Sequence, residues 1–132
     1  MIFGGEKRRN EIISSTEIVT AEGQVTAGPE MPTPVSYHTI SSINETTSIV
    51  TGGITYANPA SPETWYFNHI SQEFQPGPPL ITGRERHISA YIQDHDTMEG
   101  IVAVVGGFNG GTDDVVLDSV ELLKNGEWTQ GK

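Results

Sequence analysis

The sequence predicts an all-β protein built from a repeated unit. Three observations predict it: a Gly-Gly doublet recurs at similar spacing, an apolar run precedes each doublet, and helical periodicity is absent. The doublets are Gly4-Gly5, Gly52-Gly53 and Gly106-Gly107, so their first glycines lie 48 (52 − 4) and 54 (106 − 52) residues apart. Self-similarity at such a period is typical of repeat architectures.

Each doublet marks the end of one predicted strand and is followed by a polar loop and then another strand. The strands before the doublets are residues 1–3, 48–50 and 101–105. The strands after the loops are residues 16–19, 64–67 and 119–123. The continuous apolar character of the first set predicts central strands that are buried on both faces.

A bulky apolar residue marks the last strand of each unit. It stands 20 or 21 positions beyond the second glycine, as Val25 (25 − 5), Phe74 (74 − 53) and Trp128 (128 − 107). A glycine follows three residues later in all three units, and proline comes next in the first two. His38 and His87 each stand 10 residues beyond that glycine (38 − 28 and 87 − 77) and open further strands, predicted over residues 36–43 and 87–92.

One unit therefore contains four short antiparallel strands in a meander, which is the blade of a β-propeller. The blades are predicted at residues 1–34 (a partial blade), 35–83 and 84–132. The first unit starts at its second strand, so the prediction is 11 strands (3 × 4 − 1), or about 2.75 blades of an open propeller. Propellers typically have about four to eight blades. We expect either a piece of a longer protein or copies that associate to complete a ring.

This register resembles the Kelch family of β-propellers. The family pattern has a Gly-Gly doublet after an apolar strand, an aromatic residue in the third strand, Trp in the fourth, and Arg-x-x-His opening the next blade. The best match is Gly106-Gly107 with Val120-Glu121-Leu122 and Trp128, and residues 84–87 fit Arg-x-x-His. Departures are Val25 and Phe74 at the Trp position, and Val35 in place of the Arg ahead of His38.

The repeated residues have structural interpretations. The doublets Gly4-Gly5, Gly52-Gly53 and Gly106-Gly107 allow positive φ and close backbone approach. Phe74 and Trp128 are expected to fill the space between neighbouring blades. We expect His38 and His87 to form hydrogen bonds within their own blades.

The composition disfavours several classes of partner. The net charge is −10, from 17 acidic and 7 basic residues, and nucleic acids and anionic membranes attract clustered Lys and Arg. The one basic run, residues 7–9, is predicted to lie in a solvated loop. The chain has no cysteine, which excludes disulfides and thiolate chemistry and favours a reducing compartment such as the cytoplasm. No apolar run is long enough to cross a bilayer.

The search for chemistry favours a non-enzyme without metal or cofactor. The carboxylate pairs Asp94/Asp96 and Asp113/Asp114 fit solvated loops better than an acid-base or metal site. Residues 106–111 lack the spacing of a phosphate-binding loop or a dinucleotide fingerprint. Copper-radical oxidases are among the Kelch-like propellers, but their ligands include Cys.

The resemblance implies a protein-interaction platform whose loops form one rim of the ring and bind a protein partner. Loops on a rigid scaffold commonly carry binding residues. The candidate rim residues are Tyr56, Asn58, Arg84, Arg86, Phe108, Asn109, Asp113 and Asp114. Alternative predictions are a structural module that oligomerises to complete a ring, and a fragment of a propeller enzyme.

Overall fold

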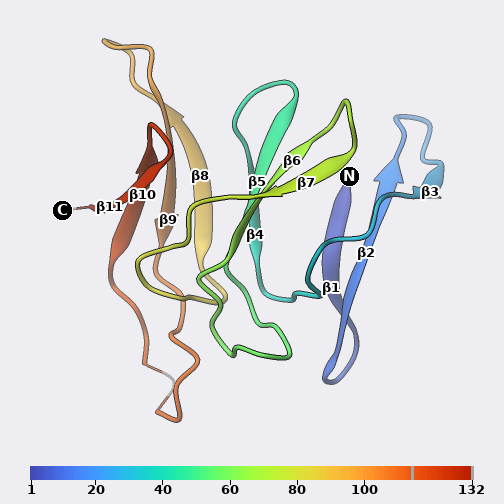
Figure 1. Ribbon diagram of the computed structural model, residues 1–132, viewed down its shortest axis with the longest axis horizontal. Coiled ribbons are helices and arrows are strands. Elements are labelled where there is room, and N and C mark those ends of the chain that lie inside the picture. Colours follow the sequence, from blue (N-terminus) through green and yellow to red (C-terminus); the bar gives the residue numbers. More distant parts are fainter. Residues whose placement is uncertain (114, 132) are drawn as a thin grey trace.

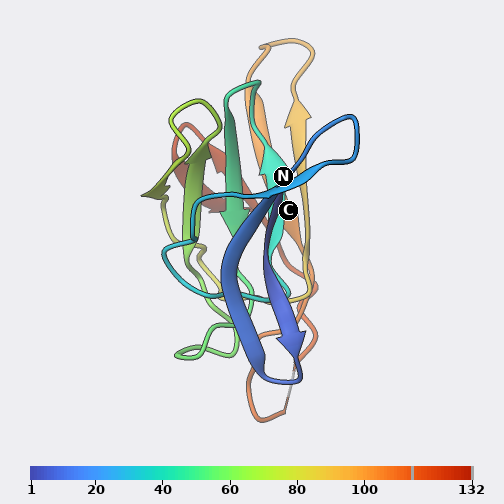
Figure 2. The ribbon, with the colours of Figure 1, turned by 90° about the vertical axis from the view of Figure 1, so that its right-hand side faces the viewer.

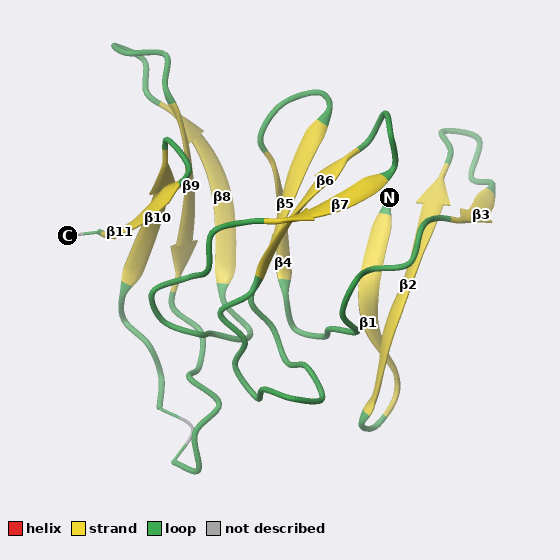
Figure 3. Cartoon of the chain, in the orientation of Figure 1, coloured by secondary structure: helices red, strands yellow, loops and turns green. Residues whose placement is uncertain are grey.

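The computed structural model describes residues 1–113 and 115–131, and there the chain forms strands, turns and loops without any helix (Figure 3). The first sheet contains β1 (Ile2–Arg8), β2 (Glu11–Val19) and β3 (Val25–Ala27). The middle sheet contains β4 (Thr39–Ser42), β5 (Thr47–Thr51), β6 (Thr64–Asn68) and β7 (Glu73–Pro76). The third sheet contains β8 (Ile88–Gln93), β9 (Gly100–Val105), β10 (Val120–Lys124) and β11 (Glu127–Gln130). Within these residues no helix exists that has the length and apolar character to cross a lipid bilayer.

Every strand pairs with its neighbour in sequence, so each sheet is an antiparallel meander. The three sheets lie side by side across the molecule in Figure 1, and from the side they stand one behind another (Figure 2). The predicted fold class is confirmed: the protein is all-β, with eleven described strands in sheets of three, four and four. This arrangement is consistent with part of a propeller.

The first sheet departs from the predicted unit, because no loop follows its glycine doublet. β1 runs through Gly4-Gly5 as far as Arg8 and turns directly into β2. Asn10 adopts φ 69°, which suits a two-residue hairpin turn. The prediction that residues 7–9 lie in a loop is therefore wrong for residues 7 and 8, which are in β1. A register shift between Phe3 and Gly5 accommodates the doublet inside the strand.

The inner strands β4 and β8 begin later than predicted. Tyr37 and Arg86 have φ values of 55° and 50°, and this left-handed conformation interrupts extended pairing. Ser36 instead forms an isolated bridge to Ile54, and Glu85 forms one to Phe108. The regular strands start just after the histidines, at Thr39 and Ile88.

The core lies between the sheets rather than within any one of them. Phe74 packs against the cluster between the first and middle sheets, and Trp128 belongs to the cluster between the middle and third sheets, as predicted. The first cluster contains Phe3, Met31, Val35, Val50 and Phe67. The second contains Ile49, Leu80, Val102, Val104, Leu123 and Trp128. Because both clusters draw on two sheets, each sheet depends on its neighbour for stability.

One extended link completes each of the two junctions. Residues 28–38 connect β3 to β4, and residues 77–87 connect β7 to β8. Met31 and Val35 of the first link and Leu80 of the second are buried in the inter-sheet clusters. The links therefore act as core elements, although they contain no regular secondary structure.

Candidate functional site

One end of the three sheets gathers the loops that the sequence places on a rim. The β1–β2 turn, the loop between β5 and β6 and the loop between β9 and β10 project from the same end in both views (Figures 1 and 2). The ends of the two links lie there too, because Ser36 and Glu85 pair with Ile54 and Phe108 of these loops. We call this end the rim.

An arginine stacked on aromatic rings lies at the rim. The guanidinium carbon of Arg86 lies 4.4 Å from the ring centroid of Tyr37 and 5.9 Å from that of Phe108. Its Nη1 donates to Glu85 Oε1 at 3.0 Å, and its backbone N–H donates to Tyr37 O at 3.0 Å. A cation over an aromatic face is stabilised by the ring quadrupole, so Tyr37 and Arg86 form one preorganised surface.

The two residues of this stack occupy equivalent repeat positions, and both have a strained backbone. Tyr37 directly precedes His38 and Arg86 directly precedes His87. Neither is glycine, yet both lie in the left-handed region, at a cost of about 1 kcal/mol or more each. Strained backbone of this kind concentrates at functional sites, where the surrounding structure holds it in place.

A hollow of about 270 Å³ lies beside the stack, and we call it the rim hollow. Its lining is Glu6, Arg9, Asn10, Ile12, Ser36, Tyr37, Ile54 and Arg86. These side chains offer both signs of charge, one aromatic ring and two aliphatic groups. Tyr37 Oη donates to Glu6 Oε2 at 3.5 Å, which joins the first sheet to the stack.

Tyr56 also ties the rim loops together. It is exposed, and its hydroxyl accepts a hydrogen bond from Ile12 N and donates one to Ile12 O, both at 3.0 Å. The loop after β5 is thereby fastened to β2 of the first sheet. Tyr56 thus supports one wall of the rim hollow and exposes its ring on the rim surface.

Arg84 is a correction to the set of rim candidates. Its side chain is fully buried and paired with Glu121, with 2.6 Å between Nη2 and Oε2. An arginine in this position is part of the core between the link and the third sheet, and it is inaccessible to a partner. The Arg-x-x-His pattern located the residue correctly but gave no information on its direction.

The remaining predicted residues support loop structure. Asn58 and Thr55 bond to each other through backbone groups, and Asn58 Oδ1 accepts from Ala60 N at 3.1 Å. Asn109 Oδ1 accepts from the backbone N–H groups of Gly111 and Val115 at 3.1 Å. Asp113 is exposed, and Asp114 lies outside the described residues.

The bonds of His87 cross between sheets, which corrects the expectation that they stay within one blade. Its Nε2 lies 2.9 Å from Thr39 Oγ1 and from Thr51 Oγ1, both in the middle sheet. Burial, and then the nearby charge of Arg84, lower the pKa of His87 to about 4. Burial likewise lowers the pKa of His38, while a hydrogen bond with the Phe3 backbone of the first sheet opposes this. Both histidines therefore join a sheet to the one before it.

The sequence prediction missed most of the rim hollow, Tyr37 above all. One signal was present: Tyr37 stands immediately before His38, at the position equivalent to Arg86. The remaining lining residues carried no such mark. Glu6, Arg9, Asn10 and Ile12 reach the rim because β1 and β2 form a continuous hairpin there instead of the predicted loop.

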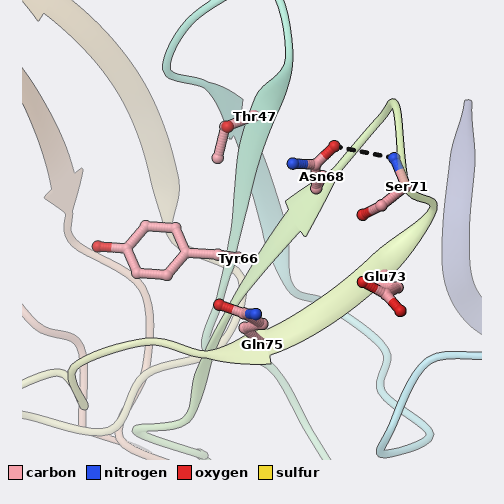
Figure 4. A pocket seen from close by; sticks show the side chains of 6 residues that line it. All are labelled: Thr47, Tyr66, Asn68, Ser71, Glu73 and Gln75. Carbon is pink, nitrogen blue, oxygen red and sulfur yellow. Dashed lines mark hydrogen bonds between the residues drawn. The ribbon is translucent and has the colours of Figure 1, made fainter.

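A second hollow of about 330 Å³ lies away from the rim, along β5, β6 and β7 (Figure 4). Thr47, Tyr66, Asn68, Ser71, Glu73 and Gln75 line it. Asn68 Oδ1 accepts from Ser71 N at 3.0 Å and so belongs to the turn between β6 and β7. These side chains are mostly short or neutral, and they form no arginine–aromatic stack of the kind that the rim carries.

The carboxylate pair at residues 94 and 96 lies at a hairpin tip between β8 and β9, as predicted. Asp94 Oδ1 accepts from Asp96 N and Thr97 N at 2.8 and 2.9 Å. These bonds lower the pKa of the Asp94 carboxyl. Over residues 1–113 and 115–131, no three His, Asp or Glu side chains come together as a metal site requires.

No protein-family model matches the sequence, and the search of curated proteins also finds no match. Function is therefore inferred from the geometry of the rim and from the repeat register.

Proposed function

We propose that this chain is a Kelch-type propeller module that binds a segment of a partner protein at its rim and does no catalysis. The repeat register of glycine doublets, histidines and bulky fourth-strand residues supports the family. The three meander sheets, packed side by side through their faces, are compatible with it.

The observation that carries the binding role is the stack of Arg86 on Tyr37 at the edge of the rim hollow. Tyrosine and arginine are enriched among residues that dominate protein–protein binding energy. Both side chains are partly exposed, and hydrogen bonds from Arg86 to Glu85 and to the Tyr37 backbone hold the stack in place. A partner would find these groups already ordered, which reduces the entropic cost of binding.

The chemistry of the rim hollow fits a peptide segment. Its aliphatic side chains, Ile12 and Ile54, suit an apolar side chain, while Glu6, Arg9 and Arg86 suit polar or charged groups. Binding sites commonly combine an apolar lining with a few placed polar groups. His87, which is buried, and His38, which is partly buried, form hydrogen bonds between sheets, where they serve the scaffold.

A selection from a displayed peptide library tests this proposal. The chain is immobilised, and recovered peptides are then measured against Tyr37→Asn and Arg86→Asn variants. Asparagine tolerates the left-handed backbone, so these variants remove the side chains and keep the conformation. We expect selected peptides to lose at least tenfold in affinity for either variant.

Glu73→Gln in the second hollow is the matched control and should bind the peptides unchanged. Recovery of peptides that bind all three variants equally would contradict the rim proposal. Failure to recover any saturable binder would contradict it as well.

A further inference from the structure

The outward face of the first sheet is the one turned away from the middle sheet. It carries residues equivalent to those with which the third sheet binds the link that precedes it. In the third sheet, the link formed by residues 77–87 lies across the face that meets the middle sheet. Two side chains fasten it: Leu80 enters the apolar cluster and Arg84 enters a buried polar site. Both anchors have counterpart receptor positions on the first sheet.

The Arg84 site consists of four oxygen atoms in the third sheet. Nη1 donates to Gly106 O at 2.9 Å and Ser119 O at 3.1 Å, and Nη2 donates to Ser119 Oγ at 3.1 Å and Glu121 Oε2 at 2.6 Å. The Glu121 carboxylate also accepts from the backbone N–H groups of Ile81 and Thr82. One glutamate thus receives both the arginine and the backbone of the link.

Strand register identifies the same receptor in the first sheet. Glu121 pairs with Val104, two residues before Gly106, and Glu17 pairs with Ile2, two residues before Gly4. Ser119 and Ser15 each stand two residues before the glutamate. Gly4, Ser15 and Glu17 therefore occupy the positions of the three residues that bind Arg84.

The apolar half of the site is repeated as well. Leu80 packs with Val104, Leu123 and Trp128 of the third sheet, and Leu123 pairs with Trp128 across β10 and β11. In the first sheet, Val19 pairs with Val25 at the equivalent place. Their side chains and that of Ile2 are exposed: Ile2 54%, Val19 42% and Val25 57%.

The middle junction shows that receptor and anchor change together. The position of Arg84 is held there by Val35, and the position of Glu121 by Trp65, which pairs with Val50. Met31 replaces Leu80 and packs with Phe67 and Phe74. An apolar anchor thus meets an aromatic receptor at the middle junction, whereas an arginine meets a glutamate at the third sheet. Because the first sheet has a glutamate, Glu17, at this position, we expect its anchor to be an arginine.

The receptor on the first sheet is unoccupied by the chain itself. In the part of the chain that the structure describes, the exposed side chains of Ser15 and Glu17 have no hydrogen-bond or ion-pair partner. A Cβ at Gly5 would meet nothing within 4 Å, whereas one at Gly53 would meet Ser36 O of the preceding link at 2.6 Å. The space that a link fills in the other junctions is open here.

We propose that the outward face of the first sheet binds an extended polypeptide segment that carries an apolar residue four positions before an arginine. The arginine pairs with Glu17 and Ser15, and the apolar residue covers Ile2, Val19 and Val25. The corresponding link segments of this chain, residues 31–35 and 80–84, are buried in its own junctions. The occupant is therefore a separate segment, and this face is distinct from the rim.

A synthetic peptide with the sequence of residues 78–84, amidated at its end, is the probe. The ¹⁵N-labelled chain is titrated with it and observed by NMR. We expect saturable shifts of the backbone amides of Ser15, Glu17 and Val19. Affinity should fall at least tenfold for the peptide with Arg84→Leu, and equally for the intact peptide on the Glu17→Gln chain.

Glu22→Gln, in the turn after β2, is the control and should bind as the unchanged chain does. The proposal is overturned if no saturable shifts occur at these amides, or if neither Arg84→Leu nor Glu17→Gln weakens them. Sedimentation of the chain alone tests a competing occupant. Self-association that is lost in an Ile2→Asp variant would assign the face to a second copy and overturn the proposal.

Discussion

Arg84 and Glu121 form an ion pair with 2.6 Å between Nη2 and Oε2, and neither side chain is exposed. The arginine belongs to the link before β8 and the glutamate to β10, so the pair joins the link to the third sheet. Most of its polar atoms are satisfied, because the guanidinium also donates to Ser119 and Gly106 and the carboxylate also accepts two backbone N–H groups. Among the described residues, the buried Nε of Arg84 has no hydrogen-bond partner. Buried charges are tolerated when they are paired and hydrogen-bonded in this way.

Removing one member of this pair should destabilise the protein strongly. We expect Glu121→Gln to lower the free energy of unfolding by about 3–5 kcal/mol, because it leaves the Arg84 charge buried without its counter-charge. Urea denaturation at pH 7, followed by far-ultraviolet circular dichroism, measures the change.

The middle junction supplies a matched control for that experiment. The double variant Arg84→Val with Glu121→Trp reproduces the Val35 and Trp65 arrangement. It should recover most of the stability lost in Glu121→Gln, since apolar replacements of buried pairs are often neutral or stabilising. A double variant less stable than Glu121→Gln would show that the pair cannot be exchanged for apolar packing.

Much of the fold follows from spacing in the sequence, because packing between sheets repeats with the strands. The glycine doublets set the register, and Phe74 and Trp128 lie between sheets where a large ring buries the most area. The register cannot give the direction of a charged side chain. Arg84 points into the core because it forms hydrogen bonds with Glu121 and Ser119 there. These partners are 37 and 35 residues away in sequence.

The rim depends even more on contacts between distant residues. Tyr37 meets Arg86 across a junction, and Tyr56 meets Ile12 across another. The left-handed backbone of Tyr37 and Arg86 carries no sequence signal, since neither is Gly, Asn or Asp. The β1–β2 hairpin also differs from the prediction, because the repeat predicts a loop after each glycine doublet and the first unit has none.

His87 should make stability decrease as the pH falls. Its pKa is about 4 in the folded protein against an ordinary value of 6.5, so the unfolded chain binds the proton more readily between these values. Its contribution is fully present above pH 6.5 and is lost progressively as the pH falls toward 4, by roughly 3 kcal/mol in total. His38 adds in the same direction.

The measurement compares urea midpoints from pH 7 to pH 4 for the unchanged chain, His87→Gln and His95→Gln. Carboxylates contribute to the slope in all three, so the difference between chains isolates the histidine. His87→Gln should flatten the dependence, and His95→Gln, at the exposed tip of the β8–β9 hairpin, should leave it unchanged. Equal slopes for His87→Gln and the unchanged chain would rule out His87 as the source.

Substitutions at the second glycine of a doublet can distinguish the cost of a close contact from the cost of a positive φ. Gly5 and Gly53 both have positive φ, at 116° and 98°. A Cβ at Gly53 would lie 2.6 Å from Ser36 O and from Val35 Cγ2, but one at Gly5 would touch nothing within 4 Å. We expect Gly5→Ala to cost about 1–2 kcal/mol from conformation alone, and Gly53→Ala to cost clearly more. Thermal unfolding of both variants decides this, and equal losses would argue that the close contact relaxes freely.

The repeat itself suggests a replacement for Trp128, because Phe74 occupies the equivalent position in the middle unit. Trp128 Nε1 donates to Pro78 O at 2.9 Å, and Thr64 Oγ1 donates to the same oxygen at 2.8 Å. Trp128→Phe therefore leaves that carbonyl with one donor, and the cost should be near 1 kcal/mol for the lost bond plus a modest packing loss.

Trp128→Ala removes the whole ring from the cluster of Ile49, Leu80 and Leu123. It should cost about 3–5 kcal/mol, because the cavity cannot collapse between two sheets. Circular dichroism in urea reports both variants without relying on tryptophan fluorescence. Should Trp128→Phe prove as damaging as Trp128→Ala, the indole N–H would be the dominant contribution, and the link that carries Pro78 would be held at this point mainly by that hydrogen bond.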